Sequence, residues 1–76
     1  MRLYLLTSLG QIDYDEYYSF VIAASDITEA RGLADQGAAY SQKEHFLDKT
    51  LTSCQYLGKA AYAVPRGIIC FHCNYG

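Results

Sequence analysis

The chain has 76 residues and a formal net charge of −2, and 51% of its residues are hydrophobic against 18% charged. This composition predicts one folded domain over residues 1–76 and excludes a disordered tail, although so short a chain buries only about 60% of the surface that its unfolded form exposes. Residues 1–38 carry six acids and two bases, whereas residues 39–76 carry two acids and four bases. This imbalance is too small for binding to duplex DNA or a membrane surface, but it suits one small anion.

Two strands are predicted in the first third of the chain. Arg2 to Thr7 alternates apolar side chains on both faces, and Tyr17 to Ala24 is an unbroken run of β-branched, aromatic and small residues. The turn-rich segment between them predicts an antiparallel hairpin with a long loop. Asp13, Asp15 and Glu16 in that loop resemble part of a calcium site, but the glycine and distal glutamate of an EF-hand are missing, which favours a solvated loop.

A helix is predicted directly after the second strand. Asp26 and Glu29 have the spacing of a capping box, and apolar residues then recur at helical spacing up to Gly37, a natural C-terminal stop. Gly32 weakens the helix by about 1 kcal/mol relative to alanine, so packing against a sheet is expected to stabilise it.

The second half of the chain predicts a loop and two more strands. Residues 38–50 show no sustained period, and we expect a mobile or functional loop there. Leu51 to Leu57 is predicted as a third strand with Thr52, Cys54 and Tyr56 on one face, and Ile68 to Cys73 as a strongly apolar last strand.

The predicted fold class is therefore α+β: a small four-stranded antiparallel sheet with one helix on one face, in the order β-β-α-β-β. One short helix covers only one face of such a sheet, yet three of the strands are apolar on both faces. The uncovered face predicts a homo-oligomer, with any ligand site where subunits meet.

The cysteines form the motif with the most chemical character. Cys70 and Cys73 have C-x-x-C spacing around His72, and Cys54 could complete a zinc site. In an extended strand, however, positions 70 and 73 point to opposite faces, so buried or free thiols without a metal are the preferred interpretation. The odd cysteine number and an N-terminal apolar run too short for a signal peptide predict reduced thiols in a cytosolic protein.

No pattern in the sequence predicts catalysis. Neither a phosphate-binding glycine loop nor a dinucleotide fingerprint is present, and no motif places a cysteine beside His45 or His72 as nucleophile and base. We therefore expect a protein that is not an enzyme and has no cofactor.

Tyrosine is unusually frequent, with eight residues in the chain. Tyrosine rings can stack on a base while lysine or arginine meets phosphate, although a single tyrosine is more often a residue of the sheet surface. The residues predicted to bind a ligand are those near the last strand and in the loop: Arg66, Lys59, Tyr62, Tyr75, Lys43 and His45.

The chain resembles a family of small phage and prophage proteins. The resemblance covers somewhat over half of the chain and is carried by the order of these pieces: RLYLLTS (2–8), DYDEYYSFVIAAS (13–25), ITEAR (27–31), LTSC (51–54) and GIICFHCNYG (67–76). The cysteines and His72 of the last piece depart from the small or polar residues expected there, and residues 38–50 are unmatched.

The resemblance implies a phage accessory protein that acts in the host cytoplasm by stoichiometric binding, in immune evasion. Its tyrosines and basic second half favour an oligomeric sponge that sequesters a nucleotide immune signal. Its acidic first half favours the alternative, an inhibitor that occupies the surface of a bacterial defence complex, as anti-CRISPR proteins do. A structural phage accessory role is the third possibility.

Overall fold

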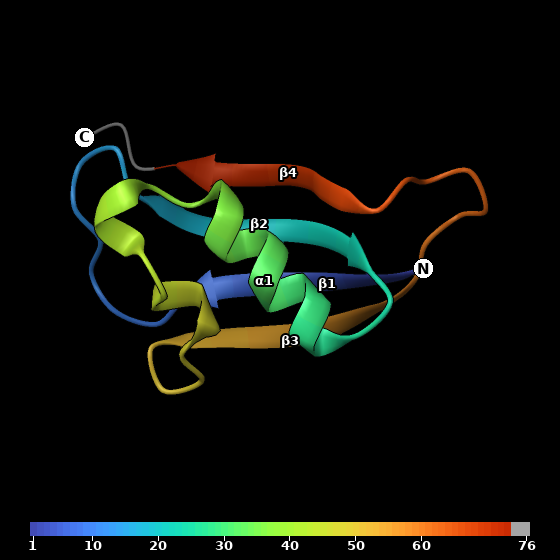
Figure 1. The fold of residues 1–76 in the computed structure, drawn as a ribbon, viewed down its shortest axis with the longest axis horizontal. Helices are drawn as coiled ribbons and strands as arrows, with labels where there is room; N and C mark the ends of the chain where they lie inside the picture. The colour runs from blue at the N-terminus through green and yellow to red at the C-terminus, as the bar shows by residue number, and fades with distance from the viewer. Residues whose placement is uncertain (74–76) are drawn as a thin grey trace.

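The computed structural model describes residues 1–73 and contains one four-stranded antiparallel sheet with a single α-helix across one face (Figure 1). The α+β architecture predicted from the sequence is thus confirmed. The elements in chain order are β1 (Arg2–Ser8), β2 (Tyr17–Ala24), α1 (Ile27–Gly37), the short 3-10 helices η1 (Tyr40–Gln42) and η2 (His45–Leu47), β3 (Thr52–Lys59) and β4 (Gly67–Cys73).

The strand order places the first hairpin at the centre of the sheet. The order is β3-β1-β2-β4, so the two later strands lie at opposite edges. The connection from β3 to β4 therefore runs along the end of the sheet where β1 begins and β2 ends (Figure 1). Because of this crossing, the N-terminal residues Met1 and Arg2 meet residues 59–62 at one end of the sheet.

The start of α1 has the cap that its sequence predicts. Asp26 has an extended backbone, and its Oδ1 accepts the Glu29 backbone N–H at 2.8 Å. The Glu29 carboxylate reaches back and accepts the Ser25 backbone N–H at 2.9 Å. The first bond satisfies a donor that the first turn of a helix leaves unpaired. The second goes to the N–H of Ser25, one residue before the cap, and not to the Asp26 N–H as in a strict capping box.

Replacing Asp26 by alanine is expected to lower the free energy of unfolding by about 1 kcal/mol, because the Glu29 N–H loses its acceptor. Urea melts of the two forms measure this change. Thr28→Ala, at an exposed position in the same turn, is the matched control and should stay within about 0.5 kcal/mol of the parent. Equal midpoints for Asp26→Ala and the parent would show that the cap does not stabilise the fold.

The core lies between the sheet and α1. Tyr4 and Leu6 of β1 and Phe20 and Ile22 of β2 are buried against Ala30 and Ala34 of α1 together with Phe46 of η2. Thr52, Cys54 and Tyr56 of β3 pair with Ser8, Leu6 and Tyr4, so they share the helix side, as predicted.

Two details of strand parity differ from strict alternation. In a regular strand Tyr17 and Phe20 would point to opposite faces, but the β2–β4 register shifts between Tyr17 and Ser19, and the Tyr17 ring stacks on Phe20 with centroids 5.1 Å apart. A second shift between Val21 and Ile22 pairs Ile22 with Ile68, so that Ile68 shares the core side with Phe71, the register partner of Phe20, although the two lie three positions apart in β4. One extra residue at a bulge reverses parity beyond it, and the sequence pattern does not reveal the bulge.

Residues 38–50 have more structure than the sequence predicts. Phe46 is fully buried against Phe20, with ring centroids 5.1 Å apart. Gln42 is also buried, and its side-chain amide exchanges two hydrogen bonds with the backbone of Tyr17, at 2.8 and 2.9 Å. The segment is therefore attached to the core at two points.

Candidate functional site

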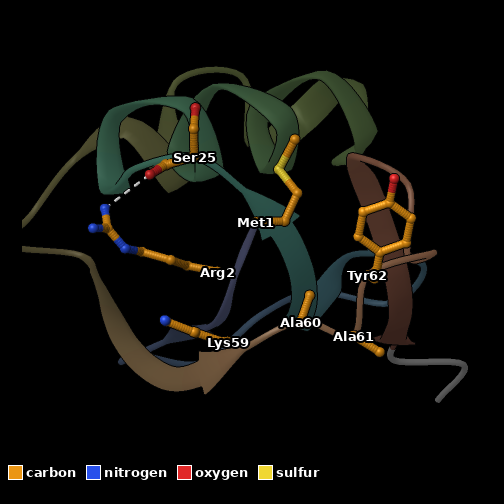
Figure 2. Close-up of a pocket in the computed structure, with 7 residues that line it drawn as sticks. All are labelled: Met1, Arg2, Ser25, Lys59, Ala60, Ala61 and Tyr62. Atoms are coloured by element: carbon orange, nitrogen blue, oxygen red, sulfur yellow. Dashed lines mark hydrogen bonds between the residues drawn. The ribbon is translucent and has the colours of Figure 1, made fainter.

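The crossing of the β3–β4 connection forms a pocket at the end of the sheet. Its volume is about 700 Å³, and the residues that line it come from the start of β1, the end of β2, the end of β3 and the connection: Met1, Arg2, Ser25, Lys59, Ala60, Ala61 and Tyr62. Figure 2 shows the Arg2 and Lys59 side chains on one side of the pocket, extending in the same direction, with Met1 and Tyr62 on the other.

Two cations lie side by side on neighbouring strands in this pocket. Arg2 of β1 is the register partner of Lys59 of β3, and residues directly opposite in an antiparallel pair have Cβ atoms about 5 Å apart. Within residues 1–73, neither side chain forms an ion pair with a carboxylate. Like charges directly opposite are destabilising. An anion bound between them would remove that repulsion.

Arg2 is held in place by the backbone just beyond the end of the neighbouring strand β2. Its Nη1 donates to the Ser25 carbonyl oxygen at 3.0 Å, just before the start of α1. This single bond uses only one of the five N–H donors of the guanidinium, so the others remain able to meet a ligand. Lys59 is exposed and carries three donors on a flexible stem.

Glu29, an acidic residue bonded to the pocket residue Ser25, already has partners. Glu29 Oε1 accepts the Ser25 N–H and hydroxyl and forms an ion pair with Arg66 Nε at 2.9 Å. The hydrogen bond from the Ser25 N–H is the main cause that lowers the pKa of the Glu29 carboxyl, and Arg66 adds to it. Glu29 is therefore ionised near neutral pH and is held by Ser25 and Arg66, with no bond to Lys59.

The structure brings together two of the residues predicted to bind a ligand, Lys59 and Tyr62. Arg66 is outside the pocket lining, in its ion pair with Glu29. Lys43 and His45 lie at the opposite end of the sheet, where β1 ends and the 3-10 helices pack (Figure 1). Within one chain, Lys43 and His45 therefore do not line this pocket, and their role in ligand binding stays a prediction. Tyr75 lies outside the described residues.

Arg2 and Ser25 are among the five pocket residues that the sequence did not indicate, with Met1, Ala60 and Ala61. For Arg2, the only sequence feature that could have indicated a binding role is that it is the one base besides Arg31 in an acidic first half. Nothing in the sequence indicated Ser25. The position of Arg2 opposite Lys59 depends on the β3-β1-β2-β4 strand order, which the spacing of apolar residues does not specify.

A serine–histidine contact occurs at the other end of the sheet. The Ser8 hydroxyl lies 3.0 Å from His45 Nε2, the arrangement of a nucleophile and its base. However, Ser8 is only 1% exposed, so a substrate carbonyl cannot reach its oxygen. The contact instead fixes η2 against the end of β1.

The thiols differ in their surroundings. Cys70 is exposed and Cys73 buried, as alternation along a strand predicts for positions three apart. Burial raises the pKa of the Cys54 thiol, which makes it a poor nucleophile at neutral pH. Among the described residues, no three His, Cys, Asp or Glu side chains are grouped as a metal site would require.

Comparisons of the chain with protein-family models, with curated proteins and with solved structures found no match. No helix within residues 1–73 is long and apolar enough to cross a membrane.

Proposed function

We propose that this chain is a non-catalytic binding protein for a phosphate-bearing nucleotide, held at the pocket of Arg2, Lys59 and Tyr62. Together with the resemblance to small phage proteins, this makes it a sponge that sequesters a nucleotide immune signal in the host cytoplasm. The observation that carries the proposal is the pair of cations opposite each other in the strand register, with no carboxylate of residues 1–73 bonded to either.

The chemistry of the pocket suits such a ligand. A phosphate group accepts charge-assisted hydrogen bonds from a guanidinium and an ammonium, and these are about twice as strong as neutral ones. The Tyr62 ring is fully exposed on the other side of the pocket, where a base could stack on it. The volume of about 700 Å³ lies within the usual range for small-molecule sites.

The residues that line the pocket suit binding without catalysis. Its lining contains two cations, a serine, a methionine, a tyrosine and two alanines, but no carboxylate, histidine or cysteine. It can therefore hold an anion by charge and stacking, and it supplies no general base at neutral pH. Sequestration needs only affinity and a protein concentration comparable with that of the signal.

Removing both cations should weaken binding strongly. Hydrogen bonds to charged groups contribute about 1.5 to 3 kcal/mol each, so Arg2→Gln together with Lys59→Gln is expected to lower affinity about 100-fold or more. The measurement is calorimetry of the parent and the variant with cyclic dinucleotides and ADP-ribose derivatives. These ligands share phosphate groups and differ in their bases and linkages.

The control variant carries the same change in net charge at the opposite end of the sheet. Lys43→Gln together with Lys49→Gln, both exposed, should leave affinity within about twofold at 0.15 M salt, where charges far from the ligand are screened. Equal losses of affinity in the two double variants would show that only the net charge of the protein affects binding. If the parent gives no heat of binding with any of these ligands, the proposal is contradicted, and an inhibitor that acts on a protein surface is favoured.

A further inference from the structure

The second face of the sheet is not covered by any element within residues 1–73. The helix-side positions of β1 are Tyr4, Leu6 and Ser8, which are buried beneath α1 and η2. The positions that alternate with them, and their register partners on the other strands, make up what we call the open face: Leu3, Leu5, Thr7, Ser19, Val21, Ala23, Ser53, Gln55, Gly58, Gly67, Cys70 and His72.

The open face lacks the charges expected of a sheet surface in water. None of its residues is Asp, Glu, Lys or Arg, although 18% of the chain is charged. Antiparallel sheets with one solvated face normally place polar side chains on it. Here Leu3, Leu5 and Val21, each partly exposed, form an apolar centre on the two middle strands beside Ala23, which is already buried within one chain. Uncharged polar residues surround one end of it, as at an interface with an apolar core and a polar rim.

The size of the open face fits a small dimer. Four strands spaced about 4.8 Å apart, each about seven residues long at about 3.3 Å per residue, give a flat area of roughly 440 Å² per copy. Two such faces give about 900 Å² as flat areas, before the relief of the side chains is added, which is close to the roughly 1,000 Å² that a specific interface should exceed.

We infer that a second copy of this chain covers the open face, so that two sheets pack face to face with the helices outside. A symmetric pair presents the same patch from both partners, and a patch without formal charge meets itself without repulsion. Stacked sheets lie about 10 Å apart, which suits interdigitating leucine and valine side chains. The centre of the contact is Leu5 and Val21, which are direct register partners on β1 and β2.

This dimer leaves the nucleotide pocket complete within each copy. All the residues that line the pocket belong to one chain, and its cations lie at the end of the sheet, with Arg2 bonded to Ser25 beside the start of α1. The inference therefore does not depend on the proposed function. A variant that separates the copies should still bind ligand, so failure of one proposal is distinguishable from failure of the other.

The test is the mass in solution of the parent and of Leu5→Lys, by light scattering from 10 µM to 1 mM. We expect the parent to show twice the chain mass of 8.5 kDa, and Leu5→Lys to show 8.5 kDa at every concentration with an unchanged circular dichroism spectrum. Leu47→Lys, an exposed leucine on η2 outside the open face, is the matched control and should remain dimeric.

If Leu5→Lys does not fold, nuclear Overhauser effects between labelled and unlabelled copies of the parent decide the question. Cross-peaks between the methyl groups of Leu5 and Val21 of different copies are expected. A parent that is monomeric at all concentrations would overturn the inference. So would a dimer that survives Leu5→Lys, or a dimer whose intermolecular contacts lie along the β4 edge.

Discussion

Replacing Phe46 by alanine is expected to cost about 3 to 5 kcal/mol of unfolding free energy, close to the whole stability of a small domain. The Phe46 ring is fully buried and packs edge-on against Phe20, which itself stacks with Tyr17. Removing it leaves a cavity between η2 and the sheet and also loosens the segment that carries its carbonyl group. That carbonyl oxygen accepts a hydrogen bond from Arg31 at 2.9 Å.

Chemical denaturation followed by far-ultraviolet circular dichroism measures this loss. The matched control is the next residue, Leu47→Ala, whose side chain is 43% exposed and whose replacement should cost less than about 1 kcal/mol. If the two variants lose similar stability, residues 38–50 are not part of the core and are better described as a loop.

Replacing Arg31 by methionine is expected to cost about 3 kcal/mol, although no carboxylate pairs with this arginine in residues 1–73. Arg31 is only 8% exposed, and its guanidinium donates to the Phe46 carbonyl and to the Thr52 hydroxyl and carbonyl. It therefore joins α1 to η2 and β3. Methionine fills much of the same space but leaves buried acceptors without donors, at about 1 to 3 kcal/mol for each one left unsatisfied.

Arg66→Met is the control for Arg31→Met. Arg66 forms an ion pair with Glu29, but its side chain is 54% exposed, and exposed pairs contribute about 0 to 1 kcal/mol. Denaturant midpoints of both variants decide between the two roles. A smaller loss for Arg31→Met than for Arg66→Met would mean that desolvation of the buried cation, whose Nε has no partner, outweighs its hydrogen bonds.

The strands and the helix could be predicted because their signals are local. The Asp26 cap, Gly37 at the end of α1 and the apolar strand runs act within a few residues, and they place each element to within about two residues. The uncovered sheet face could be predicted because one helix covers only one face of the sheet, whereas three of the strands are apolar on both faces.

The pocket and the structure of residues 38–50 could not be predicted because they depend on distant contacts. Phe46 is buried only because Phe20 and Arg31 lie opposite it, and Arg2 meets Lys59 only because β3 pairs with β1. Basic and aromatic residues near the last strand drew attention to Lys59 and Tyr62, which line the pocket. Composition alone gave no way to separate them from Lys43 and His45, which the fold places at the other end.

The most direct test of the proposed nucleotide site is a titration followed by amide chemical shifts in two-dimensional NMR. With a cyclic dinucleotide or ADP-ribose that binds, we expect the largest shifts at the amides of Arg2, Ser25 and residues 59–62, with saturation at one ligand per chain. Shifts centred on residues 38–50, or no shifts with any phosphate-bearing nucleotide at millimolar concentration, would contradict a nucleotide site at this pocket.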